Sequence, residues 1–168
     1  MNTPLTVGGL AVGLSVLVWY LGRWWHAQKN VKGSKDWKAL APFGSGILLG
    51  ILAASCAGGL LGTIAGWTRG LSNTGGDKVV TGATGASAQS LPTAGIPPLT
   101  SGGALLAVVA FVALLALWKK IKETSRKPLG FGSVCGCTLF MSSRIAGSVA
   151  LALIPLVNSA GDSILGVI

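Results

Sequence analysis

The sequence predicts an all-α fold embedded in a membrane, with about four transmembrane helices, and three observations support this prediction. First, 51% of the 168 residues are hydrophobic and only 10% are charged, whereas a soluble domain carries about 25% charged residues. Second, several apolar runs approach the roughly 20 residues that a helix needs to cross a bilayer. Third, 13 Lys and Arg stand against four acids, and most of the basic residues lie in two clusters between apolar runs. We treat residues 1–168 as one membrane domain.

The first apolar run, residues 4–22, reads as an uncleaved first span. No basic residue precedes it, and Arg23 and Lys29 follow it, which is the reverse of a secretory signal peptide. Because basic residues accumulate on the cytoplasmic side, the N-terminus is expected outside. A basic connection, residues 23–42, comes next, and its interleaved Trp residues favour a path along the membrane surface.

The second span is expected over residues 43–67, and small residues recur in it at every fourth position. Residues four apart share a helix face, and a row of small side chains lets another helix approach closely. The stripe consists of Gly46, Gly50, Ala54, Gly58, Gly62 and Gly66, with a shorter version at Gly9 and Gly13. Two interpretations stay open: packing within the chain, and contacts between subunits.

A long connection without obvious structure is expected over residues 68–101. It is rich in Gly, Ser, Thr and Pro, and a connection of this length is either flexible or functional. The third span follows over residues 102–118, which is short enough to stand nearly upright. No convincing internal repeat was identified between the two halves of the chain.

The C-terminal part of the sequence is ambiguous. A second basic loop is expected over residues 119–144, and its apolar part, 129–143, reads as an interfacial or re-entrant segment. Arg144 is placed at the cytoplasmic interface because an arginine at mid-membrane costs about 2.5–3.5 kcal/mol. The fourth span is then residues 145–165, and the alternative is one long span through Arg144.

These assignments place both basic loops on the cytoplasmic side and both termini outside, most simply in a bacterial cytoplasmic membrane. Anionic lipid headgroups are the expected partners of the loops, and no specific nucleic acid is expected. The residues expected at the headgroups are Arg23, Trp24, Trp25, Lys29, Lys32, Lys35, Lys38, Trp118, Lys119, Lys120, Lys122, Arg126, Lys127 and Arg144.

The sequence lacks the patterns of a membrane enzyme. It contains no HExxH, Gly-x-Ser-x-Gly or Walker A motif, and its only histidine, His26, lies in a basic loop. Cys135 and Cys137 lack the further ligands that a zinc site needs, so no metal, cofactor or catalytic residue is expected. Asn158 and Asp162 share a helix face, and they read as an ion site or as the outer water interface.

We therefore expect a non-catalytic integral membrane subunit of a larger assembly of the phage, mobile-element transfer or secretion type. Such a subunit would associate with itself or with other membrane subunits through small-residue helix faces. The alternative is a self-assembling, holin-like pore or small channel. A small solute transporter is disfavoured because it predicts an internal repeat and a polar site at the midplane.

Overall fold

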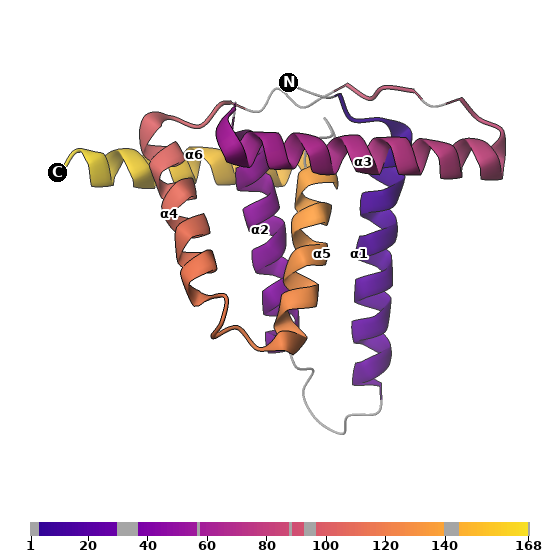
Figure 1. The fold of residues 1–168 in the computed structure, drawn as a ribbon, viewed down its shortest axis with the longest axis horizontal. Helices are drawn as coiled ribbons and strands as arrows, with labels where there is room; N and C mark the ends of the chain where they lie inside the picture. The colour runs from indigo at the N-terminus through magenta and orange to yellow at the C-terminus, as the bar shows by residue number, and fades with distance from the viewer. Residues whose placement is uncertain are drawn as a thin grey trace.

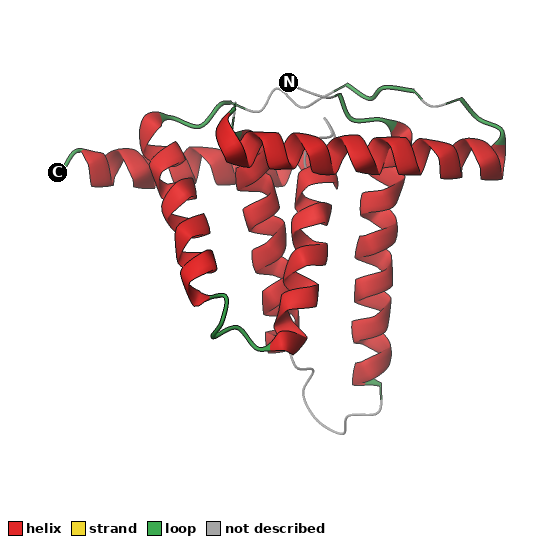
Figure 2. Ribbon diagram, in the orientation of Figure 1, coloured by secondary structure: helices red, strands yellow, loops and turns green. Residues whose placement is uncertain are grey.

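The computed structural model of the protein describes residues 4–29, 37–56, 58–87, 89–92, 97–139 and 145–167. Within these ranges the chain is helical, and its only extended pairing is one bridge between Thr6 and Ser90 (Figure 2). The predicted all-α class is confirmed for this part of the chain. The elements are α1 (Val7–Gln28), the 3-10 helix η1 (Trp37–Leu40), α2 (Ala41–Ser55), α3 (Gly59–Thr84), α4 (Ser101–Leu117), α5 (Glu123–Leu139) and α6 (Ile145–Leu165).

Four helices stand side by side and two lie across them (Figure 1). The upright helices are α1, α2, α4 and α5, and the transverse helices α3 and α6 lie at the end where α1 and α4 begin. By length and composition, three segments could cross a membrane: Val7–Gln28, Trp37–Ser55 and Ser148–Leu165. Ser101–Leu117 is a shorter apolar helix. The 22 residues of α1 extend about 33 Å at 1.5 Å per residue, close to the thickness of a bilayer core.

The prediction of one continuous helix over 43–67 is wrong, because the chain turns between α2 and α3. α2 ends at Ser55, and its C-cap residue Cys56 has an extended backbone. Gly59 then adopts a φ of +70°, which a residue without a Cβ reaches at little cost. α3 therefore leaves the upright bundle and crosses in front of it, near the end where α1 begins.

The prediction of an irregular loop from residue 68 is also wrong over its first half, since α3 continues to Thr84. Its buried residues Arg69, Ser72 and Gly76 follow the 3–4 spacing of a helix face. Tertiary packing thus offsets the poor helix propensity of Gly and Thr. After α3 the chain returns over α1, where the Val7 N–H donates to the Gln89 carbonyl at 3.0 Å.

The chain consists of two similar three-helix repeats, which corrects the expectation that no repeat exists. In each repeat an upright helix is followed by a second upright helix and then by a transverse helix. The sequences agree where the structures do: residues 4–9 read PLTVGG and residues 98–103 read PLTSGG. Likewise, 73–77 read NTGGD and 158–162 read NSAGD. Each upright pair runs away from the transverse helices and back, so the repeats are parallel.

The C-terminal repeat changes the interpretation of residues 119–165. Residues 129–139 lie in α5, where Leu129 and Leu139 are buried, and not in a separate surface segment. Residues 145–165 form one helix, α6, but it lies transverse to the upright helices. Arg144 lies outside the described residues.

Candidate functional site

The centre of the molecule is a close contact between α2 and α5. Gly46 faces Gly132 and Gly50 faces Gly136, so a Cβ built on Gly46 would lie 3.0 Å from the Gly132 Cα. A Cβ built on Gly50 would likewise lie 3.0 Å from the Gly136 Cα. The contact is reciprocal, because a Cβ built on Gly132 or Gly136 would lie 3.1 Å from the Cα of its partner glycine on α2. Each glycine pair joins one residue from each repeat. In membrane proteins, faces of small residues let two helices pack backbone to backbone in this way.

The other residues of the expected small-residue stripe are divided between elements. Ala54 is buried in a cluster with Ala53, Ala65 and Cys137, whereas Gly58 has no atom within 4 Å of its added Cβ. Gly62 and Gly66 belong to α3, so they do not continue the face of α2. The structure therefore brings the first three stripe positions together and separates them from the rest.

Gly9 and Gly13 of α1 are both buried, and they contact different helices. A Cβ on Gly9 would meet the Asn73 side chain of α3, and a Cβ on Gly13 would meet Thr138 of α5. The Cys135 thiol of α5 also approaches the Gly13 carbonyl at 3.6 Å. The short stripe of α1 therefore packs inside the chain.

The first helix junction joins the start of α1 to α3. The Asn73 carbonyl oxygen accepts from the Thr6 N–H at 3.3 Å, and the Asn73 amide donates to the Pro4 carbonyl at 2.8 Å. The Asp77 carboxylate accepts from the Gly8 N–H at 3.1 Å. Amide groups at a helix start have no partner within the helix, so α3 supplies acceptors for α1.

The second junction repeats this arrangement between α4 and α6. The Asn158 carbonyl oxygen accepts from the Thr100 N–H at 3.0 Å, and the Asn158 amide donates to the Pro98 carbonyl at 3.3 Å. The Asp162 carboxylate accepts from the Thr100 hydroxyl at 2.9 Å. Asn158 and Asp162 therefore both form hydrogen bonds with the segment that begins α4.

Arg69 is a buried charged residue whose equivalent in the second repeat is apolar. It is 4% exposed, its Nε–H donates to the Ala65 carbonyl at 3.4 Å, and Ala65 lies in one buried cluster with Cys137 of α5. Burial lowers the pKa of the guanidinium below its usual value. The equivalent residue of α6 is Ile154, which is fully buried and packs with Ile51. Sequence reasoning missed Arg69 because it placed this residue in an irregular loop.

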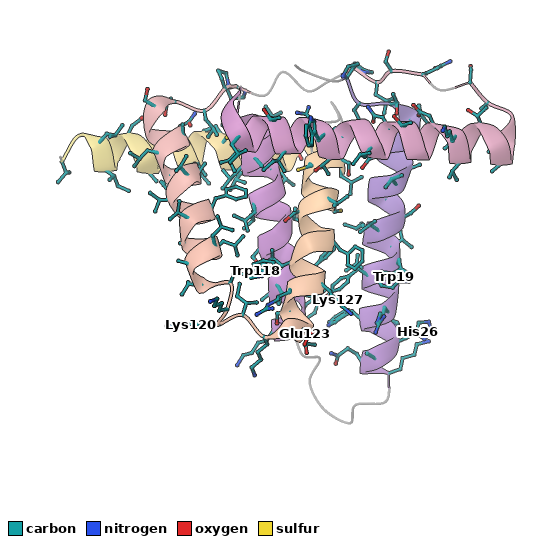
Figure 3. The ribbon with its side chains drawn as sticks, in the orientation of Figure 1. Trp19, His26, Trp118, Lys120, Glu123 and Lys127 are labelled. Atoms are coloured by element: carbon teal, nitrogen blue, oxygen red, sulfur yellow. The ribbon has the colours of Figure 1, made fainter. Side chains whose placement is uncertain are left out.

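The expected headgroup residues that the structure describes gather at the end opposite to α3 and α6. Figure 3 shows Trp118, Lys120, Glu123 and Lys127 there, beside the ends of α4 and α5, and His26 near the end of α1. Trp24 lies 5.1 Å from Trp37 between ring centroids. The described parts of the two basic regions thus lie at the same end of the upright helices. Lys32 and Lys35 lie outside the described residues.

Two arginines at this end lie over indole rings. Arg23 is 5.6 Å from the Trp19 ring centroid, and Arg126 is 5.7 Å from that of Trp118. Cation–π contacts of this kind hold a guanidinium beside an aromatic ring. They leave each arginine at the level of the Trp residues, where lipid headgroups are expected.

The described residues contain no group of three or more His, Cys, Asp or Glu that could hold a metal ion. Cys135 and Cys137 are buried, and Cys56 is partly exposed. The Cys137 thiol donates to the Gly50 carbonyl at 3.4 Å, so Cys137 contributes to the contact between α2 and α5.

No family model matches the chain, and the comparisons with curated proteins and with solved structures found no match.

Proposed function

We propose that this protein is a non-catalytic integral membrane subunit of a larger assembly, with α1, α2, α4 and α5 crossing the bilayer. The observation that carries the proposal is the separation of the two ends of the upright bundle. Trp118 and the basic residues around it lie at one end, with the end of α1 and its Trp24 and Trp25, whereas the transverse helices, which carry Trp67, Arg69 and Lys78, lie at the other. Aromatic and basic residues mark a membrane–water boundary.

The charge distribution supports a topology with both termini outside. Of the 13 basic residues, five lie in residues 23–38 and five in residues 119–127. The ends of the upright helices that border these two segments lie together, so the segments are cytoplasmic by the positive-inside rule. The number of spans stays at four, but the fourth span becomes α5 in place of α6. A bacterial cytoplasmic membrane fits this charge bias.

The polar groups within the helices support a structural role. Asp77 and Asp162 each accept a hydrogen bond at a helix start, which leaves neither carboxylate facing the other as an acid–base pair. Every buried side-chain nitrogen and oxygen in the described residues has a hydrogen-bond partner. Catalysis usually relies on closely spaced titratable groups that face a common cleft.

The described small-residue contacts hold the chain's own helices together, as at Gly46 and Gly50. Association with other subunits therefore has to use the outward surfaces of the bundle and its basic end. The holin-like pore stays the alternative. Since α2 and α5 touch through their backbones at the centre, such a pore would form between several copies.

The experiment is extraction of the tagged protein from its native membrane in a mild detergent, followed by size analysis and mass spectrometry. The subunit proposal would be supported if other membrane proteins are recovered with this protein in a fixed ratio. Each of those proteins, when it is tagged in turn, should also recover this protein. A lone homo-oligomer that releases a trapped dye from vesicles would contradict it and favour the pore.

A further inference from the structure

The transverse helices carry a second apolar face that their packing in the bundle does not use. On α3 the buried residues Ala65, Arg69 and Gly76 form one face. The exposed residues Leu60, Ile64, Trp67 and Leu71 recur at intervals of four, three and four. Both sets follow helical spacing, and at 100° per residue they lie on opposite sides of α3.

Two positions of this pattern recur on α6, where Val149 is equivalent to Ile64 and Leu156 to Leu71, whereas the equivalent of Trp67 is Ala152. Ala150 and Ile154 are buried, whereas Val149 and Leu156 are exposed. Leu156 corresponds to Leu71 in the repeat, and their side chains are 67% and 77% exposed. We name Leu60, Ile64, Trp67 and Leu71, together with Val149 and Leu156, the outer stripes.

The contacts of α3 fix the direction in which its outer stripe points. Its inner face meets Gly8 in the first turn of α1 and Ala53 in the last turn of α2. α3 therefore packs against the sides of the upright helices, within their terminal turns. The opposite face points sideways, away from the bundle, at the depth of those turns.

We propose that the outer stripes of α3 and α6 lie in the outer leaflet, at the boundary between headgroups and acyl chains, as two in-plane lipid anchors. This inference rests on the proposed crossing of the bilayer by the upright helices. The terminal turns of those helices then reach the membrane surface, and a sideways-facing apolar stripe at that depth meets lipid. Trp67, which is 74% exposed, has the ring type that concentrates at this boundary.

The repeat supports lipid as the occupant in preference to one protein neighbour. α3 crosses in front of the upright helices and α6 passes behind them (Figure 1). The two outer stripes thus face opposite ways, although they have matching residues such as Leu71 and Leu156. Lipid surrounds a membrane protein and can cover both outer stripes, whereas a single neighbouring protein can cover only one of them. The polar positions Thr74 and Lys78, which follow Leu71 on the exposed side, fit the headgroup region.

The test is spin labelling of the full chain in vesicles of phosphatidylglycerol and phosphatidylethanolamine. Labels are placed at Leu71→Cys and Leu156→Cys after Cys56→Ser, since Cys135 and Cys137 are buried. Val112→Cys, at an exposed apolar position of α4, reports whether the upright helices enter the bilayer. Ser87→Cys, in an exposed loop beyond α3, is the water-side control, and each variant must first be monodisperse.

At both outer-stripe positions, oxygen is expected to relax the label several-fold more effectively than a water-soluble nickel chelate does. The labels at these two positions should lie at a shallower depth in the bilayer than the label at Val112. At Ser87 the nickel chelate should relax the label more effectively than oxygen does. If the nickel chelate reaches the labels at Leu71 and Leu156 while the label at Val112 lies deep in the bilayer, the two helices are not lipid anchors. The proposal that the upright helices cross the membrane would then still hold. Labels shielded from both reagents would also overturn them, since protein would then cover the stripes. Nickel access at Val112 would defeat both proposals.

Discussion

Gly50 of α2 and Gly136 of α5 lie against each other at the centre of the molecule. A Cβ built on Gly50 would lie 3.0 Å from the Gly136 Cα, and one built on Gly136 would lie 3.1 Å from the Gly50 Cα. This reciprocal contact joins the two repeats through their backbones. In lipid, where hydrophobic attraction between helices is weak, such close packing is a main source of association.

Gly50→Leu is therefore expected to destabilise the fold by at least the usual cost of overpacking, about 1–3 kcal/mol. The measurement is unfolding of the purified protein in detergent micelles by a denaturing detergent. Gly44→Leu is the matched control, since Gly44 lies on the same helix with no atom within 4 Å of its added Cβ. Equal losses for the two variants would contradict the central contact.

The two junctions predict paired effects at Asp77 and Asp162. Asp77→Ala should cost about 1 kcal/mol, the typical value for losing a side-chain acceptor at a helix start, because the Gly8 N–H loses its partner. Asp77→Asn keeps an acceptor and should retain most of the stability. The measurement is hydrogen exchange at the start of α1, which should speed up in the alanine variant alone.

Asp162→Ala is expected to act in the same way on the start of α4, since the Thr100 hydroxyl donates to Asp162. Hydrogen exchange should then change at α4 and not at α1. If Asp162→Ala instead leaves exchange unaltered but changes an ion-dependent property, the ion-site interpretation of Asn158 and Asp162 would replace the structural one.

Arg69 and Ile154 occupy equivalent positions, and exchanging their chemistry should have opposite effects. Arg69→Ile is expected to leave thermal stability unchanged or to raise it, since replacing a buried charge with a well-packed apolar side chain is often neutral or stabilising. Ile154→Arg should lower stability, because Ile154 is fully buried among apolar residues. A large loss of stability in Arg69→Ile would show that the guanidinium is needed for folding.

The basic end predicts a preference for anionic lipid. Changing Lys119, Lys120 and Lys122 to Gln should weaken the stabilisation that phosphatidylglycerol gives by about 1 kcal/mol per charge removed. The measurement is the thermal shift on adding phosphatidylglycerol or, as a control, phosphatidylcholine to the micelles. Lys78→Gln, on α3 at the opposite end, should leave the difference between the two lipids intact.

The sequence predicts the helical class well, because class follows from composition and apolar run length. Prediction of the helix boundaries from sequence fails where the local signal is weak. At Gly58 and Gly59, for example, the sequence reads as a continuation of the glycine-rich helix. The extended backbone of Cys56 and the φ of +70° at Gly59 mark the turn that separates α2 from α3.

The junctions were harder to predict, since they depend on contacts between residues about 60–70 positions apart, such as Gly8 and Asp77. One signal was nevertheless present. The segments PLTVGG and PLTSGG, each followed later by an Asn-x-x-Gly-Asp pattern, indicate two repeats. Without a fold to align them, these short matches are separated by dissimilar apolar sequence, which hides the repeat.

The most direct test of the account is the side of the membrane on which α6 begins. A cysteine is introduced at Ser148 or at Lys120 in a Cys56→Ser background, in which the remaining Cys135 and Cys137 are buried, and intact cells are treated with a membrane-impermeant maleimide. We expect Ser148→Cys to be labelled from outside and Lys120→Cys to be labelled only after lysis, because α5 crosses the bilayer between them. Labelling of both positions only after lysis would contradict it, since α6 would then be the fourth span and α5 would remain on the cytoplasmic side.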